Sequence, residues 1–170
     1  MKGDLGIYFN WSANELEGDP RATDRYLREN KSAILRVAQE LMERIHYVPT
    51  PIFRGIILRQ PVEVIDPHPG FTYLSFSTER KVAEHFADVN GFGSDYLDVS
   101  KQLGSYGYVI SYTPAMSEVL FHHDLFSYLP YQEAFSLQRM GGIGKVEFLK
   151  AQKEVVILQP AAPFKDISKM

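Results

Sequence analysis

The sequence has no cysteine, no excess of positive charge and no long apolar run, and each absence excludes a class of protein. Without cysteine the chain has no disulfide, no thiolate metal site and no cysteine nucleophile. The formal net charge of -3 at pH 7 provides no global attraction for nucleic acid, so phosphate contacts would need a local basic patch. No apolar run reaches the roughly 20 residues that cross a bilayer, and the N-terminus, with Lys2 and Asp4, does not resemble a signal peptide. We therefore expect a cytoplasmic protein without a membrane partner.

The composition is that of a globular protein. The chain has 170 residues, of which 45% are hydrophobic and 23% charged, enough to bury the core of one ordinary domain. No repeat, low-complexity segment or long linker divides it. We expect a single domain, residues 1–170, in which a helical part (1–48) precedes a β-rich catalytic core (49–170).

The helical part carries one amphipathic stripe. Its apolar residues recur at helical spacing and are Ala33, Ile34, Val37, Ala38, Leu41, Met42 and Ile45. Asp19-Pro20 and Asp24 are helix start signals. The helix should end before Pro49, because proline disfavours a helical residue ahead of it.

The β-rich part consists of short apolar runs separated by turn residues. The expected strands are Ile52–Leu58, Thr72–Phe76, Tyr106–Tyr112, Glu118–Phe121, Lys145–Leu149 and Glu154–Leu158. One helix, from Glu79 to about Asp88, interrupts them, with Val82, Ala83 and Phe86 facing inward and Ser77 or Thr78 as its N-cap. Helices followed by many strands predict an α+β fold.

An arginine stands inside the first apolar run. Arg54 lies between Phe53 and Gly55, and a buried guanidinium is costly unless an anion or a carboxylate pairs with it. Its planar fork suits a phosphate or a carboxylate, and Gly55 would leave room for a ligand near the backbone. A surface arginine on an edge strand, or one in a structural ion pair, is the alternative interpretation.

Two further polar patterns accompany the strands. Ser75 lies inside its strand, so helix capping does not explain it. It could orient a neighbouring carboxylate or a ligand hydroxyl, and an ordinary solvent-facing serine is the alternative. Gln152 and Glu154 are two residues apart, so an extended chain points both to one face. The same pattern would arise if Gln152 and Glu154 simply lay on the solvent-exposed face of an edge strand, with Lys153 on the opposite face.

Taken in order, these motifs resemble the R-S-E group of ADP-ribosyltransferases. Arg54 matches the arginine of the first core strand, Ser75-Phe76-Ser77 matches a Ser-Thr-Ser element, and Gln152-Lys153-Glu154 matches Glu/Gln-x-Glu. Tyr108–Pro114 looks like the middle strand of the family. The resemblance covers roughly the last two-thirds of the chain. It implies a mixed β-sandwich core packed against the N-terminal helices, with NAD+ held in a cleft between the sheets.

The resemblance also implies the chemistry. Glu154 would bind the 2′-hydroxyl of the nicotinamide ribose and stabilise the oxocarbenium-like charge as nicotinamide leaves, while Ser75 would hold that carboxylate in place. The residues implied to bind NAD+ are Arg54, Gly55, Ser75, Ser77 and Phe92. No metal is implied.

The acceptor of ADP-ribose is less defined. Gln152 would face it, and because Gln carries no charge, an arginine acceptor is disfavoured. Phe148 is a candidate for the aromatic residue of the loop that contacts the acceptor, with a core phenylalanine on a strand as the alternative. The acceptor would be a non-arginine protein side chain or a base of RNA or DNA. A small enzyme of this type fits a toxin or effector, a toxin–antitoxin pair or phage defence, with an antitoxin or immunity protein as partner. An NAD+ glycohydrolase toxin and a non-catalytic interaction module on the same fold are the alternatives.

Other chemical groups carry weaker patterns. His122-His123-Asp124 looks like a metal cluster, but adjacent strand residues point opposite ways, which disfavours a shared ion. Glu147 is the main rival to Glu154 as the catalytic carboxylate. Glu118 and Glu133 are weaker rivals, and we expect both at the surface.

Overall fold

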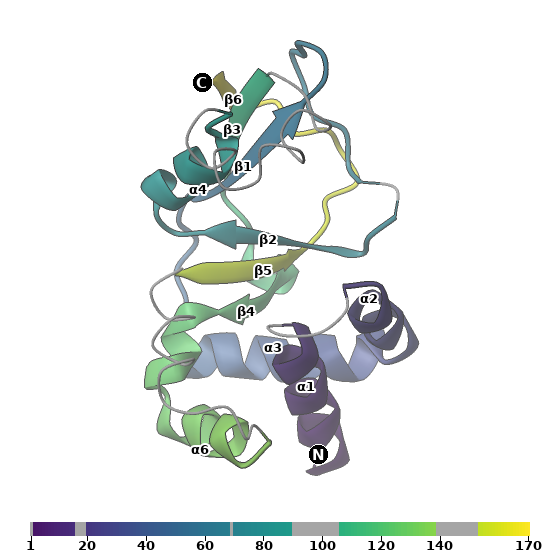
Figure 1. Ribbon diagram of the computed structural model, residues 1–170. Helices are drawn as coiled ribbons and strands as arrows, with labels where there is room; N and C mark the ends of the chain where they lie inside the picture. The colour runs from purple at the N-terminus through teal and green to yellow at the C-terminus, as the bar shows by residue number, and fades with distance from the viewer. Residues whose placement is uncertain (1, 16–19, 69, 90–105, 139–152) are drawn as a thin grey trace.

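A computed structural model describes residues 2–15, 20–68, 70–89, 106–138 and 153–170. Figure 1 shows the arrangement of the helices and strands. The helices are α1 (Lys2–Glu15), α2 (Pro20–Glu29), α3 (Lys31–Arg44), α4 (Arg80–Ala87) and α6 (Leu129–Gln138), with short 3-10 helices η2 (Met116–Glu118) and η3 (His123–Ser127). The strands are β1 (Ile52–Leu58), β2 (Tyr73–Ser77), β3 (Tyr106–Tyr112), β4 (Val119–His122), β5 (Glu154–Leu158) and β6 (Ile167–Lys169).

The predicted amphipathic helix is α3, and its apolar stripe is buried against β4 and α1. The helix ends well before Pro49, as predicted, but a C-terminal cap rather than the proline ends it. His46 adopts a left-handed φ of 54°, its amide donates to the Glu43 carbonyl at 3.1 Å, and the Tyr47 amide donates to the Met42 carbonyl at 2.9 Å. This is the hydrogen-bond pattern of a Schellman motif.

Of the two helix start signals predicted in the helical part, one is confirmed and the other is wrong. Pro20 is the first residue of α2, a position where its missing N–H costs nothing. Asp24 lies within α2 instead of starting a helix. Its buried carboxylate accepts a 2.6 Å hydrogen bond from the Thr72 amide and pairs with Arg28 at 3.0 Å, so it fixes the approach to β2.

The strands form one six-stranded sheet in the order β4-β5-β2-β1-β3-β6. Each described strand pair is antiparallel, which differs from the expected mixed β-sandwich. The expected strand at 145–149 lies outside the described residues. Helices together with one antiparallel sheet agree with the α+β class.

The sheet is weakly joined in its middle. β1 pairs with β2 at a single position, Phe53 opposite Ser77, whereas β1 pairs with β3 along its whole length and β2 pairs with β5 along its whole length. Figure 1 shows the consequence: β2, β5 and β4 lie one above another, and β1 runs away from them at a steep angle. The sheet therefore consists of two three-stranded halves that meet at one point.

Helix α4 covers the half formed by β1 and β3. A Cβ on Gly55 would meet the Ala83 carbonyl oxygen at 1.9 Å, and a Cβ on Gly107 would meet the Ala87 carbonyl oxygen at 1.9 Å. Both glycines let the backbone of α4 lie directly on the sheet. The expectation that Gly55 leaves room for a ligand is therefore wrong on the Cβ side, because α4 already fills that space.

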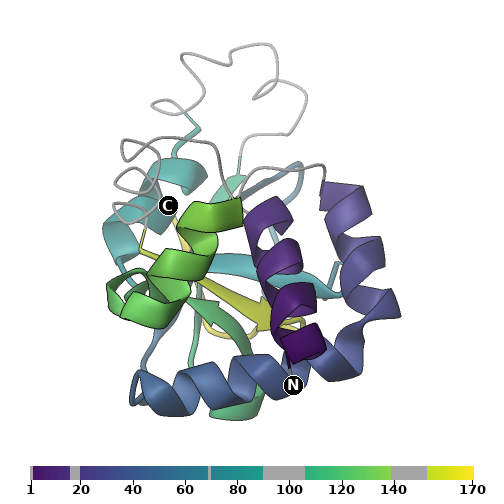
Figure 2. The same cartoon turned by 90° about the horizontal axis from the view of Figure 1, so that it is seen from below.

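The other helices gather around the β4 edge. Figure 2 shows α1, α3 and α6 together on this side of the molecule. The fully buried Tyr8 of α1 donates a 2.8 Å hydrogen bond to the Leu120 carbonyl of β4. Trp11, also fully buried, contacts the ring of Tyr73 on β2 edge-on at 6.2 Å. Among the described helices, none has the length and apolar character that crossing a membrane would require.

Candidate active site

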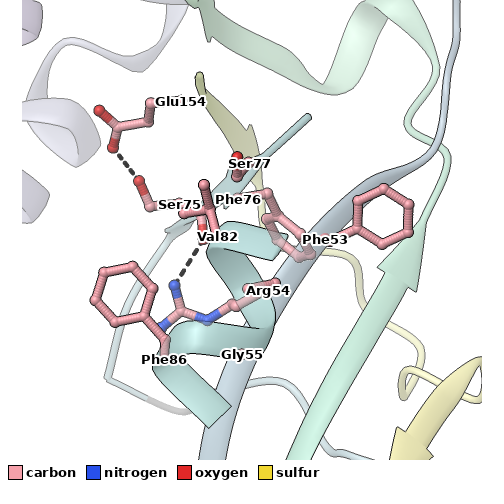
Figure 3. Close-up of a pocket in the computed structure, with 10 residues that line it drawn as sticks. Phe53, Arg54, Gly55, Ser75, Phe76, Ser77, Val82, Phe86 and Glu154 are labelled. Atoms are coloured by element: carbon pink, nitrogen blue, oxygen red, sulfur yellow. Dashed lines mark hydrogen bonds between the residues drawn. The ribbon is translucent and has the colours of Figure 1, made fainter. Parts of the chain in front are cut away.

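A cavity of about 300 Å³ opens where the two halves of the sheet diverge. β1, β2, the first residue of β5 and one side of α4 form its walls (Figure 3). Its lining consists of Phe53, Arg54, Gly55, Ser75, Phe76, Ser77, Val82, Ala83, Phe86 and Glu154. Six of these ten residues belong to the two strands that meet at only one position.

Arg54 brings a cation into this cavity from β1. Its Nη1 donates a 2.7 Å hydrogen bond to the Ser75 carbonyl oxygen on β2, in the other half of the sheet. Burial lowers the pKa of Arg54, because a desolvated guanidinium loses the water that stabilises its charge. Among the described side chains none forms an ion pair with it. The site thus presents a partly compensated cation to an anionic ligand.

Glu154 brings a carboxylate to the same cavity from the start of β5. The Ser75 hydroxyl donates a hydrogen bond to its Oε1, which confirms the expectation that Ser75 orients a carboxylate. Burial raises the pKa of Glu154, and the hydrogen bond from Ser75 opposes part of that rise. Figure 3 shows the resulting chain from Arg54 through Ser75 to Glu154.

The backbone before Glu154 is held in an unusual conformation. Lys153 has a positive φ of 52°, which is uncommon for a residue with a side chain. Its carbonyl accepts a 3.0 Å hydrogen bond from the Thr78 amide, so the turn into β5 is tied to the end of β2. This arrangement fixes where the Glu154 side chain enters the cavity.

Ser77 is a buried residue of the cavity wall, 4% exposed, and not the N-cap of α4. The N-cap is Glu79, which forms no side-chain capping hydrogen bond. Ser77 Oγ accepts a 3.1 Å hydrogen bond from the Glu79 amide, so it supports the turn just ahead of the helix. The prediction that Ser77 or Thr78 caps α4 was one to two residues early.

Two residues of α4 line the cavity instead of the core. The sequence places Val82, Ala83 and Phe86 on one inward face, but only Ala83 is buried, with 1% of its surface exposed. Val82 and Phe86 line the cavity, and Phe86 is 42% exposed. The apolar pattern located this face correctly but did not distinguish a cavity wall from packed core.

Several predicted site residues lie outside the described part of the chain. They are Gln152, Phe148 and Phe92, together with the rival carboxylate Glu147. The other two rivals have described positions. Glu133 is exposed on α6, whereas Glu118 is half-buried and accepts hydrogen bonds from the Tyr112 hydroxyl at 2.5 Å and the Ala115 amide at 3.0 Å. Neither of these two glutamates lines the cavity.

His122 and His123 do not point opposite ways, contrary to the prediction, because the chain leaves β4 and enters η3 between them. Their rings stack at 4.4 Å, and the potential ligand atoms of His122, His123 and Asp124 lie within 4.8 Å of one another. His122 Nδ1, however, already accepts a 3.0 Å hydrogen bond from the Asp124 amide. Burial, chiefly, and the neighbouring His123 lower the pKa of His122 to about 4. A neutral His122 that caps η3 accounts for these contacts.

Comparisons of the chain with models of protein families, with curated proteins and with solved structures found no match. Any function of this chain therefore depends on the chemistry of the site. That site joins a half-buried carboxylate, a hydroxyl that holds it and a cation within one small cavity with an apolar wall. Such a set can bind an anionic ligand at one end and stabilise developing positive charge at the other.

Proposed function

We propose that this protein is a mono-ADP-ribosyltransferase, which moves ADP-ribose from NAD+ to a macromolecular acceptor. One observation carries the proposal: Arg54, Ser75 and Glu154, far apart in the sequence, line one cavity and are joined by hydrogen bonds through Ser75. These are the three residues on which the resemblance to the R-S-E group rests.

Arg54 binds the anionic part of NAD+. A pyrophosphate supplies the partner that the guanidinium lacks among the described side chains, and the planar fork can bind two phosphate oxygens at once. Binding also relieves the cost of keeping the cation in a partly desolvated position.

Glu154 acts at the other end of the substrate. It accepts a hydrogen bond from the 2′-hydroxyl of the nicotinamide ribose and stabilises the positive charge that grows on the ribose as the C1′–N bond breaks. The bonding electron pair leaves with nicotinamide, which becomes neutral. A lone pair of the acceptor then forms the new bond to C1′, and the acceptor loses a proton. Ser75 keeps the carboxylate oriented, so little reorganisation is needed during the reaction.

The acceptor in this proposal is a non-arginine protein side chain or a nucleic-acid base. Gln152, two residues before Glu154, is neutral and would not attract a guanidinium. An enzyme of this kind would serve as a toxin or effector, and an antitoxin or immunity protein would be its natural partner.

Nicotinamide release from NAD+ tests the proposal. The parent protein, Glu154→Gln and Glu133→Gln are compared, because Glu133 is an exposed glutamate away from the cavity and provides a matched control. We expect Glu154→Gln to lose about 100-fold or more in rate, and Glu133→Gln to retain parental activity. Equal turnover by the parent and Glu154→Gln would remove Glu154 from the mechanism.

Labelled NAD+ in a lysate identifies the acceptor class. Label that is released by protease but not by nuclease indicates a protein acceptor, and the reverse result indicates RNA or DNA. Free ADP-ribose as the sole product, with lysate present, would replace the transferase assignment by that of an NAD+ glycohydrolase.

A further inference from the structure

Helix α2 carries a stripe of exposed arginines. Arg21, Arg25 and Arg28 are four and three residues apart, so they lie on one face of the helix, and all three are exposed. Arg28 pairs through its Nε with the buried Asp24, yet its side chain remains 61% exposed. Residues 20–31 contain four basic and two acidic side chains, whereas the whole chain has a net charge of -3. The arginine stripe is therefore a local positive patch on an acidic protein, of the kind that phosphate contacts require.

An aromatic pair, His68 and Phe71, lies next to this stripe in the chain segment that contacts α2. The two rings are tilted, with their centroids 4.9 Å apart; His68 is exposed and Phe71 is half-buried. Phe71 immediately precedes Thr72, whose amide donates to Asp24 of α2. The Gln159 side chain accepts a 2.6 Å hydrogen bond from the His68 amide and donates to the carbonyls of His68 at 2.7 Å and Phe71 at 3.0 Å. Rings on a segment held in this way can stack on a flat base at little cost in ordering.

Strand β2 connects the aromatic pair to the cavity. Thr72 leads directly into β2, and Ser75 follows three residues later, which is about 10 Å along an extended strand. Tyr73 and Ser75 share one face of β2, because alternate side chains point the same way, and the ring of Tyr73 contacts Trp11 of α1. α1 packs on α2, and Figure 1 shows α2 at the end of the sheet where β2 begins. One extended ligand can therefore reach from the arginine stripe to the cavity.

We infer that the arginine stripe and the aromatic pair bind a single-stranded nucleic acid, which is the acceptor of ADP-ribose. The inference rests on the proposed function and narrows its acceptor to a base of RNA or DNA. The arginines bind phosphates, the aromatic pair stacks on an unpaired base, and a neighbouring base enters the cavity, which a base stacked inside a duplex could not reach.

The transfer step balances with a base as acceptor. The bond between C1′ and the nicotinamide nitrogen breaks, and its electron pair leaves with nicotinamide. A lone pair on a nitrogen of the base then forms the new bond to C1′, and that nitrogen releases its proton to solvent. No oxidant, reductant or further reactant is needed.

Oligonucleotide binding without NAD+ tests the surface by itself. Fluorescence anisotropy follows single-stranded RNA, single-stranded DNA and a duplex of the same length on the parent, on Arg21→Gln/Arg25→Gln and on the matched control Arg44→Gln/Lys165→Gln, which removes two exposed charges elsewhere. We expect the parent to bind single strands more tightly than the duplex. The loss of two phosphate contacts should reduce the steepness of log K against log salt concentration by about 1.4, and the control should keep the parental slope.

Phe71→Leu tests the stacking contribution separately. Loss of the ring should weaken the binding of single strands by about 5- to 150-fold without changing the salt dependence, and Phe71→Tyr should bind like the parent, since tyrosine keeps an aromatic face. A Tm close to the parental value verifies that Phe71→Leu is folded. The exposed His68 provides a second variant, His68→Leu, if the half-buried Phe71 proves necessary for folding.

Labelled NAD+ then tests the role as acceptor. Label on the oligonucleotide, together with a Glu154→Gln protein that binds the oligonucleotide equally well but leaves it unlabelled, supports the inference. Label on protein alone, in a mixture of oligonucleotide and lysate, would overturn the nucleic-acid acceptor and leave the transferase proposal standing. Equal affinity and salt dependence of the parent and Arg21→Gln/Arg25→Gln, or no oligonucleotide binding by the folded parent, would overturn the surface. A parent that binds the oligonucleotide but releases no nicotinamide would overturn the proposed function and the acceptor role together.

Discussion

Glu154 couples the chemistry of the site to the stability of the protein. Its raised pKa means that the folded state binds the proton more tightly than the unfolded state. Below the ordinary glutamate pKa both the folded and the unfolded state are protonated, so the contribution of Glu154 to the free energy of unfolding does not change with pH. As pH rises from that ordinary value through the raised folded pKa, only the unfolded state has lost its proton, so the free energy of unfolding falls.

We therefore predict that Glu154→Gln stabilises the protein at neutral pH. The neutral amide removes the cost of a desolvated charge, and each kcal/mol recovered raises the Tm by roughly 2–4 °C for a chain of this length. The gain should shrink toward zero as the pH is lowered below the ordinary glutamate value. Thermal melts of the parent, Glu154→Gln and Glu133→Gln across this pH range measure the effect. A gain that is independent of pH would contradict its electrostatic origin.

Arg54 supports a second prediction, which concerns binding alone. Arg54→Lys retains the charge but loses the planar fork and the reach of Nη1 to the Ser75 carbonyl. We expect NAD+ and ADP-ribose to bind about 10-fold more weakly, a difference of about 1.4 kcal/mol, because both carry the pyrophosphate. Calorimetry measures this loss, and unchanged affinities for both ligands would exclude Arg54 as the anion-binding residue.

Helix α4 and the first half of the sheet pack through two glycines. Gly55→Ala and Gly107→Ala would each drive a Cβ into backbone atoms of α4, where the nearest oxygen lies at 1.9 Å. Because a helix backbone cannot yield locally, we expect each change to lower the free energy of unfolding by about 1–3 kcal/mol or more. Gly55→Ala should also weaken NAD+ binding, because movement of α4 displaces the cavity wall formed by Val82 and Phe86.

The matched control for these variants is Gly6→Ala in α1. No atom lies within 4 Å of the Cβ position at Gly6, and alanine is the better helix former, so stability should rise by about 0.5–1 kcal/mol. Denaturant unfolding of the three variants measures these changes. Equal changes in stability in all three variants would contradict a specific clash of the new Cβ atoms with the backbone of α4.

Sequence patterns located most elements because the apolar periodicity was strong. The expected bounds of β1, β3 and β5 match the structure, since each is a short apolar run rich in β-branched or aromatic residues. The first turn of α4 was misplaced because serine and threonine are common caps, yet the extended Glu79 takes that position. α6 and β6 were not predicted; the sequence of β6, Ile-Ser-Lys, is too short to show a period.

The polar residues of the candidate site could be predicted from the sequence, but the apolar residues that form its walls could not. Arg54 and Ser75 were conspicuous because a charge and a hydroxyl interrupt apolar strands. Phe86 gave no such signal, since an apolar residue on a helix looks the same whether it meets core or cavity. The sheet order, which brings β1 and β5 to either side of β2, depends on contacts between distant segments that local patterns do not encode.

At the scale of the whole molecule, most buried apolar residues form one cluster that reaches both halves of the sheet, whereas Ala83 and Ala87 of α4 pack with Val109 in a second cluster. Trp11, the single tryptophan, is fully buried between α1 and β2, while the cavity lies beyond β2 on the side of β1 and α4. Tryptophan emission therefore reports on packing of α1, whereas circular dichroism reports on all helices and strands.

We predict that NAD+ raises the Tm by the same amount whether unfolding is followed by tryptophan fluorescence or by circular dichroism. A ligand that binds only the folded state stabilises it by about 2.7 kcal/mol at a concentration of 100 Kd, and a cooperative unit transmits that gain to every part. Thermal melts followed by Trp11 fluorescence and by circular dichroism, with and without NAD+, provide the measurement. A shift confined to circular dichroism would show that α1 unfolds separately from the half of the sheet that contains Arg54.

The single backbone pairing between β1 and β2 has a mechanical consequence. Arg54 belongs to one half of the sheet and Glu154 to the other. A dinucleotide bound by both residues would therefore hold the two halves together across a seam, the β1–β2 contact, that few backbone hydrogen bonds close. Substrate occupancy would then slow hydrogen exchange along both edges of the seam, including amides of β1 and β2 that the ligand does not touch. The same seam would make the protein without ligand most susceptible to proteolysis close to Glu154.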